Sequence, residues 1–396
     1  MIYYILFFGL FITSLFDFAS NNAKVKYRLF VFWIVVFVLF KALRWETGTD
    51  WAQYYNCFKE ATWNNFMSFW RYGEHTTKLE PGYVLLNVII KTFFPHYTFF
   101  LLITNAFILW VFGSLIRKFI PQYSLIALLL VILSSEIFPV RQTLPIAIFC
   151  YSLIYVYQQR CFPYLALIIL AVFFHRVFII IIPFYWFLSK RMTLKSTLII
   201  YLTLIFFKNI VIDLIDILSS VPFINTLTGG LLLTYQLGSD VLQNSEYQQD
   251  ISVISQLFTY ANSILMLVIF FYARNLNEKK GKDTRGFNIF LNIYICFICI
   301  NVISLLPGFF MLYRVTNIFA IGYPMCIAMS LYAIDKKYIL LKLIFVLFAF
   351  IIKLNSQPCI DKNSLHYDLF VPYCSVFDKE EDIPLIRKDV WPYRNW

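Results

Sequence analysis

The first long polar stretch of this sequence carries a carboxylate behind a turn, with aromatic residues directly after it. Asp50 follows Gly48 and Thr49, six residues after Arg44 closes an apolar run. A carboxylate that a turn holds at a membrane surface, walled by aromatic rings, can act as a general base. The alternative is an interfacial loop, in which tryptophan and tyrosine rings lie at headgroup level and the charges are solvated.

A second carboxylate, Glu80, lies near the end of the same stretch. It precedes Pro81, which forces the backbone before it into an extended conformation. We expect one of Asp50 and Glu80 to act as the base that activates a hydroxyl, and the other to position a sugar or pair with an arginine. The first loop contains no Asp-x-Asp pair, and the chain has neither a glycine-rich phosphate loop nor an H-E-x-x-H motif. The sequence therefore indicates no metal and no cofactor.

Cationic residues gather at the ends of apolar runs that we place on the outer side of a membrane. Arginine suits a phosphate better than lysine, because its planar fork donates two parallel hydrogen bonds. We therefore expect an anionic headgroup or pyrophosphate site. Its predicted residues are Arg44, Arg141, Gln142, His175, Arg176, Tyr313 and Arg314. Taken singly, each arginine also fits a residue that snorkels to the headgroups, and His175 fits a hydrogen-bonded core histidine.

The composition identifies the elements that must position these residues. Of the 396 residues, 60% are hydrophobic and 14% are charged, whereas soluble domains carry about 25% charged residues. The chain is too apolar for a disordered or nucleic-acid-binding protein, and the formal net charge of +11 fits basic cytoplasmic loops. The sequence therefore predicts an all-α polytopic membrane protein.

Apolar runs predict about twelve crossings, and basic clusters give their direction. The basic loop that contains Lys24, Lys26 and Arg28 is expected inside, so that the N-terminus lies outside. The predicted spans are Met1–Phe16, Leu29–Leu43, Tyr97–Ile116, Tyr123–Leu133, Thr143–Tyr157, Phe162–Phe174, Val177–Leu188, Ser196–Leu218, Ile251–Ala273, Phe287–Leu306, Val315–Ile334 and Tyr338–Leu354.

The segment Gly82–Phe94 is apolar but only about 13 residues long, or about 20 Å as a helix. If it crossed, every later basic cluster would fall outside, so we expect it to be re-entrant. The outer loop before it, residues 44–81, is expected to hold interfacial helices at Trp51–Phe58 and Trp63–Tyr72.

The chain is predicted to form one transmembrane domain, residues 1–354, with a second outer loop at 219–250 and an extracytoplasmic tail at 355–396. Cys296 and Cys299 lie inside an apolar run, which favours buried thiols over a metal or redox site. Cys359 and Cys374 both lie in the tail and could pair if the tail is extracytoplasmic.

The run Arg44–Tyr54 resembles the EpsG-type exopolysaccharide polymerases, relatives of the Wzy-type O-antigen polymerases. The family pattern is an arginine, a Gly-Thr-Asp turn, an aromatic residue and a tyrosine shortly after. Four later places resemble the family in the same order: Glu80–Asn87 (a Glu-x-Gly-Tyr segment), Arg141-Gln142, Phe174-His175 and Tyr313-Arg314.

The resemblance implies a multi-pass glycosyltransferase of the GT-C type in the bacterial inner membrane. It would join repeat units carried on undecaprenyl pyrophosphate at the periplasmic face, among membrane lipids, and a chain-length regulator is a candidate partner. In GT-C enzymes an acidic residue of the first outer loop serves the acceptor hydroxyl, which points to Asp50. Sugar stacking would then fall to Trp51, Tyr54 and Tyr83. A flippase for the same lipid-linked sugar and an O-antigen ligase are the alternatives, and no internal repeat of the kind found in transporters is visible.

Overall fold

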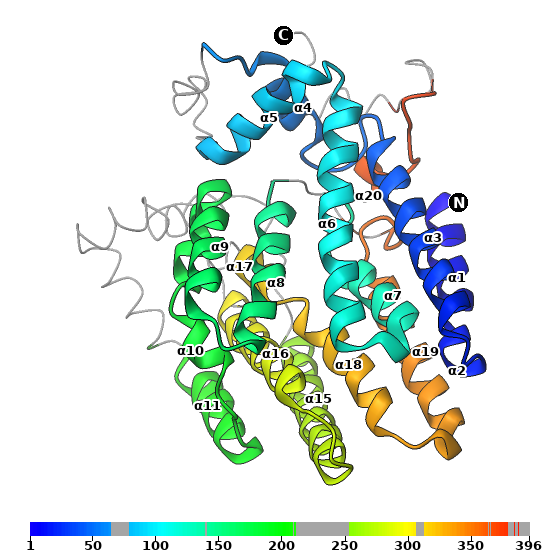
Figure 1. Ribbon diagram of the computed structural model, residues 1–396, viewed down its shortest axis with the longest axis vertical. Helices are drawn as coiled ribbons and strands as arrows, with labels where there is room; N and C mark the ends of the chain where they lie inside the picture. Colours follow the sequence, from blue (N-terminus) through cyan, green and yellow to red (C-terminus); the bar gives the residue numbers. More distant parts are fainter. Residues whose placement is uncertain are drawn as a thin grey trace. The chain divides into compact units, whose positions relative to one another are not determined.

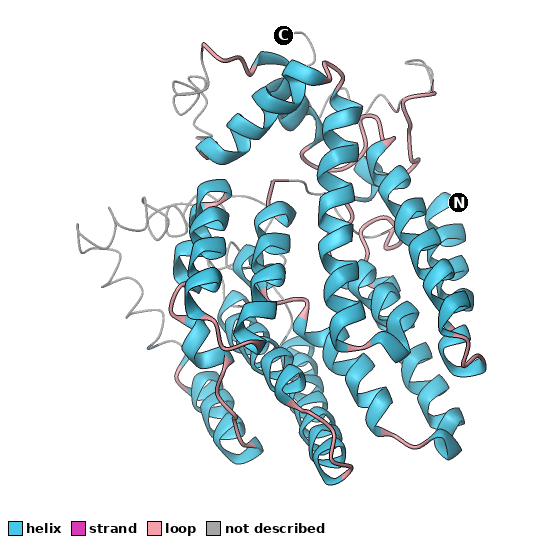
Figure 2. Ribbon diagram, in the orientation of Figure 1, coloured by secondary structure: helices cyan, strands magenta, loops and turns pink. Residues whose placement is uncertain are grey.

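The computed structural model describes residues 1–64, 79–138, 141–208, 210, 253–305, 313–362, 364, 366–378, 384 and 387, apart from the side chains of Val253 and Tyr313. Within these residues every regular element is a helix (Figure 2). The chain divides into two compact units. The first comprises Met1–Tyr151, Leu170–His175 and Ile339–Trp396, and the second comprises Ser152–Ile169 and Arg176–Tyr338.

The first unit is built around α7, Ser124–Ser134, whose apolar side chains are almost all fully buried. It packs against α1, α3, α6 and α19 (Figure 1). The other helices of this unit are α1 (Ile2–Ser14), α2 (Phe16–Ala19), α3 (Ala23–Ala42), α4 (Trp51–Glu60), α5 (Pro81–Phe93), α6 (Tyr97–Phe119), α19 (Ile339–Asn355) and α20 (Tyr367–Phe370), together with parts of α8 (Thr143–Tyr157) and α9 (Cys161–Phe174). A helix that is apolar all round is a core helix, so α7 does not face lipid.

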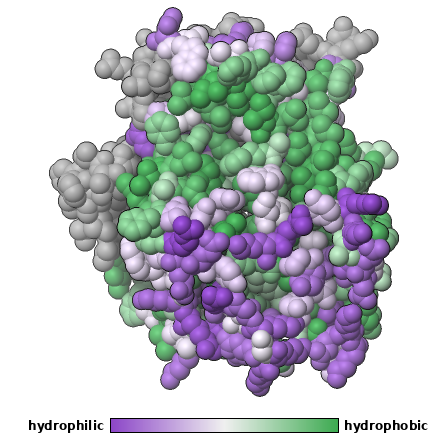
Figure 3. Space-filling view, viewed as in Figure 1, coloured by the Kyte–Doolittle hydropathy of each residue, from purple (hydrophilic) through white to green (hydrophobic). Residues whose placement is uncertain are grey.

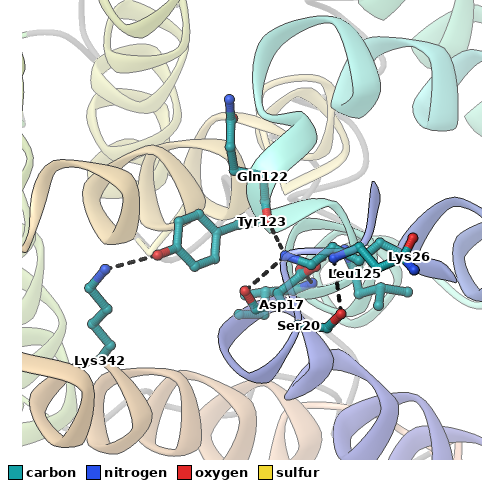
Figure 4. Close-up of polar contacts among 9 residues, drawn as sticks. Asp17, Ser20, Lys26, Gln122, Tyr123, Leu125 and Lys342 are labelled. Carbon is teal, nitrogen blue, oxygen red and sulfur yellow. Dashed lines mark hydrogen bonds and ion pairs between the residues drawn. The ribbon is translucent and has the colours of Figure 1, made fainter. Parts of the chain in front are cut away.

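Buried charges fasten the end of this unit at which α7 begins (Figure 4). Asp17 Oδ2 accepts hydrogen bonds from the backbone N–H groups of Leu125 and Ile126, at 2.8 and 3.0 Å. Lys26 Nζ lies 3.7 Å from Asp17 Oδ1, and Lys342 Nζ donates to the Tyr123 hydroxyl at 2.8 Å. The carboxylate satisfies N–H groups that a helix start leaves unpaired, so α2, α3, α7 and α19 are joined at this end.

The second unit is built around α16, Arg285–Ser304, which packs against α10, α11, α15, α17 and α18. These helices are α10 (Phe184–Leu188), α11 (Leu194–Phe206), α15 (Val253–Lys279), α17 (Tyr313–Ile318) and α18 (Gly322–Ala333). A Cβ on Gly322 would lie 2.6 Å from the backbone nitrogen of Tyr294, so glycine permits the close packing of α18 on α16. Ion pairs such as Arg191–Glu278, at 2.7 Å, lie at the polar helix ends.

The surfaces of the long helices are those of a membrane protein. Five helices are long and apolar enough to cross a membrane: Ile2–Ala19, Tyr97–Phe119, Ile254–Lys279, Arg285–Ser304 and Lys336–Asn355. The exposed side of α6 carries Phe99, Ile103, Phe107 and Trp110 at helical spacing. Hydrophobic side chains also cover much of the face drawn in Figure 3. The chain is therefore an all-helical polytopic membrane protein, as predicted.

Two predicted spans are wrong as single helices. The span Val177–Leu188 is a 3₁₀ segment, Arg176–Ile181, followed by the short helix α10 after Pro183, because proline lacks the N–H that would continue a helix. The span Val315–Ile334 is interrupted by a turn at Phe319–Ile321 and forms α17 and α18. The number of crossings and the re-entrant path of Gly82–Phe94, which is helix α5, stay predictions. Most of Trp63–Tyr72 and all of loop 219–250 lie outside the described residues.

Candidate functional site

Glu80 begins helix α5 and is almost fully buried. Its backbone is extended, with φ −73° and ψ 146°, and Pro81 occupies the first helical position. Proline fits there because that position has no intrahelical use for an N–H group. The Glu80 side chain is 6% exposed. A carboxylate at a helix N-terminus also faces the positive end of the helix dipole, so the local sequence Glu-Pro-Gly-Tyr both starts the helix and holds the charge.

Arg141 binds Glu80 across 61 residues of sequence. Its Nε and Nη2 atoms both donate to Glu80 Oε2, at 2.9 and 2.6 Å. Burial lowers the pKa of Arg141, but the Glu80 carboxylate and the Tyr54 and Tyr83 hydroxyls together raise it more, so its pKa lies above the ordinary value. The Nη1 group makes no hydrogen bond with the part of the chain that the structure describes. That edge of the guanidinium can therefore donate to an anion.

His175 lies near the other oxygen of the same carboxylate. Its Nδ1 atom lies 3.5 Å from Glu80 Oε1, an ion pair when the imidazole is protonated. The residue extends the last turn of α9, where its N–H donates to the carbonyl of Ala171 at 2.9 Å. Glu80 therefore connects Arg141 and His175, and three of the places that resemble the polymerase family come together within the first unit.

Gly82 allows this meeting. A Cβ at this position would lie 2.5 Å from Cδ1 of Phe173, 2.7 Å from its carbonyl oxygen and 2.9 Å from its carbonyl carbon. Such contacts do not occur between real atoms, and the last two involve backbone, which cannot rotate away. Only glycine lets the first turn of α5 approach the end of α9, two residues from Glu80 and from His175.

Asp50 directly precedes α4, as Glu80 precedes α5, but its side chain is exposed. Its carboxylate makes no hydrogen bond or ion pair within the described part of the chain. The turn before it is tightly bent, since Gly48 has a φ of 103° and Glu46 a φ of 42°. One helical turn after Asp50, Tyr54 packs on Tyr83 with 5.6 Å between ring centroids, and both hydroxyls lie close enough to Arg141 to interact with its charge. Asp50 and the Glu80 cluster are therefore linked through α4 and α5, which lie beside the start of α6 (Figure 1).

Arg44 is buried and binds the turn that precedes Asp50. It is 3% exposed, donates from Nη1 to the Thr47 carbonyl at 3.2 Å, and lies 4.7 Å over the Phe138 ring. Burial lowers the pKa of Arg44. The structure thus shows a contact to the protein's own backbone, and the predicted contact to pyrophosphate stays a prediction.

The three aromatic residues predicted to stack on sugar are core residues in this structure. Trp51, Tyr54 and Tyr83 are 3%, 7% and 0% exposed, and other rings cover them, as Tyr55 covers Trp51 at 4.8 Å. No ring face of these three is open to a ligand. Trp45 and Tyr55, at the edge of the same cluster, are partly exposed. Their partial exposure could not be predicted from the sequence, because all of these rings alternate with polar residues in a similar way, and sugar stacking stays a prediction.

The remaining predicted site residues are Gln142, Arg176, Tyr313 and Arg314. Gln142 is half-buried immediately before α8, and its carbonyl accepts from Ile146 N–H at 3.4 Å. Arg176 begins the 3₁₀ segment of the second unit, Arg314 is exposed on α17 of that unit, and the side chain of Tyr313 lies outside the described residues. Their contact with substrate stays a prediction.

The tail packs on the first loop, which the sequence did not predict. Arg44 and Ser375 form an antiparallel β-bridge, and the N–H of Trp45 donates to the Cys374 carbonyl at 2.9 Å. No local pattern signals a contact across this separation in sequence. All eight cysteines are free thiols. The pairing of Cys359 with Cys374, left open by the sequence, is therefore not formed.

Comparison with known proteins gives one match, to a protein family. No curated protein and no solved structure matches the chain. A family model described as the EpsG family matches residues 27–375, which include the Asp50 turn, Glu80, Arg141 and His175. Because this match covers most of its length, the chain belongs to the EpsG family, a family of Wzy-type polysaccharide polymerases.

Proposed function

We propose that this polymerase transfers a growing glycan from undecaprenyl pyrophosphate to a sugar hydroxyl of a lipid-linked repeat unit, at the periplasmic face of the inner membrane. The observation that carries the proposal is the buried Glu80 carboxylate shared by Arg141 and His175. Glu80 fixes the Arg141 guanidinium, whose Nη1 group makes no hydrogen bond within the described residues, and the exposed Asp50 carboxylate lies in the same unit. That arrangement has a base and an anion-binding group, which glycosyl transfer to a hydroxyl requires.

The two carboxylates take different roles in this proposal. The Glu80 side chain is almost fully buried, and its Oε2 atom accepts two hydrogen bonds from Arg141, so this carboxylate serves mainly as the partner of Arg141. Asp50 is exposed at the start of α4. We therefore assign the base to Asp50, and to Glu80 the task of orienting the two cationic side chains.

The reaction follows from these roles. Asp50 accepts the proton of the acceptor hydroxyl as its oxygen forms a bond to the anomeric carbon of the donor glycan. The bond from that carbon to the pyrophosphate oxygen breaks, and its electron pair leaves with undecaprenyl pyrophosphate. Arg141 stabilises the charge on the leaving group through the N–H groups that Glu80 does not use. The partly exposed rings of Trp45 and Tyr55 offer apolar faces on which a sugar can stack.

The experiment uses purified protein in detergent with a lipid-linked repeat unit, and it measures the length ladder of the product. We expect Asp50→Asn to slow polymerisation about 10²- to 10⁴-fold and Arg141→Ala about 10²- to 10³-fold. Arg117→Ala and Asp361→Asn are matched controls, because both residues are exposed and lie outside the proposed site, and both variants should give the normal ladder.

Three outcomes would contradict the proposal. The first is that the wild-type protein makes no polymer in detergent, as expected of a flippase, because detergent has no second compartment into which a lipid could be moved. A ligase would transfer a finished polymer without lengthening it. A normal ladder from folded Asp50→Asn protein would remove Asp50 from the reaction. The family match gives no support to the flippase or the ligase.

A further inference from the structure

The turn that leads to Asp50 has a backbone that its own residues do not favour. Glu46 has a φ of 42°, in the left-handed region that residues with a Cβ rarely adopt. Gly48, with a φ of 103°, tolerates its conformation because it has no Cβ. Such a conformation persists where surrounding contacts hold it in place. The partners of this turn therefore decide where Asp50 lies.

Arg44 donates to the Thr47 carbonyl of this turn, and the tail supplies further partners. The N–H groups of Trp45 and Gly48 donate to the carbonyls of Cys374 and Leu369, both at 2.9 Å. The Thr47 hydroxyl accepts from the N–H of Cys374 at 3.2 Å. Thus the amides on both sides of Glu46 and Thr47 bind tail backbone rather than their own segment, and the turn depends on the tail for its shape.

Arg387 fastens the tail to the turn. Its side chain is fully buried, at 0% exposure. It donates to two groups of the turn, the Glu46 carbonyl at 2.9 Å and the Thr47 hydroxyl at 3.3 Å. On the tail side it donates to the Asp368 carbonyl, the Pro372 carbonyl and the Cys374 sulfur. One rigid guanidinium therefore binds both segments at the same time, a task that a flexible lysine with three donors cannot fully reproduce.

These acceptors are all neutral, three carbonyls, a hydroxyl and a thiol. Burying a guanidinium among neutral acceptors costs free energy, and the charge of the Glu46 carboxylate offsets part of that cost. Arg387 also lies beyond residues 27–375, the part that the EpsG family model matches. The arrangement fits a local device that serves the turn.

We propose that Arg387 is a positioning residue for the polymerase reaction, which holds the Glu46–Gly48 turn and thereby sets the place of Asp50. The inference rests on the proposed function, because it assumes that Asp50 acts on the acceptor hydroxyl. It adds a residue of the tail to the machinery of the first loop, and it requires the tail and the first loop to lie on the same side of the membrane.

A double-mutant cycle separates positioning from general support of the fold. In the wild-type background we expect Arg387→Ala to lower kcat about 10- to 100-fold, the range for a misplaced catalytic group. In the Asp50→Asn background the same change should alter the rate by no more than about twofold, because the group it positions is already disabled. In the Arg141→Ala background the two losses should multiply. Arg387→Lys should lie between wild type and Arg387→Ala, and Arg285→Ala, which removes an exposed arginine, should have no effect.

Hydrogen exchange tests the same contact without relying on activity. In Arg387→Ala the amides of Trp45 and Gly48 should exchange faster than in wild type, while those of α7 should be unchanged. Thr47→Val removes the hydroxyl that Arg387 and Cys374 share, at nearly constant volume. This variant replaces Arg387→Ala in the double-mutant cycle if Arg387→Ala does not yield folded protein.

The inference would be overturned if Arg387→Ala showed wild-type amide exchange and a wild-type polymerisation rate. It would also be overturned if the loss of rate caused by Arg387→Ala multiplied with the other losses in every background, Asp50→Asn included. If the wild-type chain makes no polymer, the proposed function is contradicted instead. Faster amide exchange in Arg387→Ala would then still show that Arg387 holds the Glu46–Gly48 turn.

Discussion

Replacing Gly82 by alanine tests whether the close approach of α5 to the end of α9 assembles the Glu80 cluster. The new methyl group would meet the Phe173 carbonyl at 2.7 Å and its carbonyl carbon at 2.9 Å. Ordinary contact begins near 3.4 Å, so the first turn of α5 must retreat by roughly 0.5–1 Å, and Glu80 must move with it. The 2.6 and 2.9 Å bonds to Arg141 would lengthen or break.

Two consequences can be measured separately. Overpacking of this kind costs about 1–3 kcal/mol of stability, which thermal unfolding in detergent would report. A displacement of about 1 Å in a catalytic cluster costs about 10²-fold in rate, which the product ladder would report at a temperature where the variant is folded. The loss of rate should therefore exceed what the loss of folded protein explains.

Two further variants test the reasoning. Gly113→Ala is the matched control, because its Cβ would meet the end of the Ile34 side chain at 2.7 Å, a group that can rotate away. It should polymerise normally. Adding Phe173→Ala to Gly82→Ala should rescue the rate only in part, since the backbone contacts remain. Full activity of folded Gly82→Ala would refute the argument, and full rescue by Phe173→Ala would show that backbone contact is not limiting.

Three other expectations follow from the same structure. Glu80→Gln leaves the mostly buried Arg141 guanidinium without its carboxylate and should cost about 3 kcal/mol of unfolding free energy; an unchanged melting temperature would argue against the ion pair. Trp45→Ala and Tyr55→Ala should raise KM for the lipid-linked repeat unit more than they lower kcat, and a pure loss of kcat would argue against sugar stacking. Asp17→Asn removes the charge at the start of α7 and should cost about 1 kcal/mol of stability with no change in the ladder; normal stability with a shortened ladder would contradict its structural role.

Much of the helical framework could be predicted because apolar runs are long and charges lie between them. Helix α8 spans Thr143–Tyr157, the same range as the apolar run. The breaks near Pro183 and Ala320 were missed, since an apolar run conceals a local change of backbone direction. Hydropathy measures what a segment prefers to contact, and it does not report whether the segment is one straight helix.

The site could be predicted in its membership more than in its geometry. The order of motifs brought Glu80, Arg141 and His175 into one expected site, but only the structure shows that one carboxylate binds both cations. Burial was not predictable for Trp51 and Tyr83, because an aromatic ring has the same sequence signal in a core and at a ligand surface. Arg387 gave no signal at all, since its partners in the first loop lie about 340 residues earlier in the chain and its tail partners are two carbonyls and a thiol with no recognisable pattern.

The contact between Arg387 and the first loop also constrains how the protein is made. The arginine binds the carbonyl of Glu46, which lies 341 residues earlier in the chain. At about 5–20 residues per second, roughly 20–70 s of translation separate the two ends of this bond. The first loop is therefore synthesised long before the arginine that fastens it. A nascent chain that has not yet reached Arg387 therefore lacks the finished turn, and polymerase activity should begin only after Arg387 has been added.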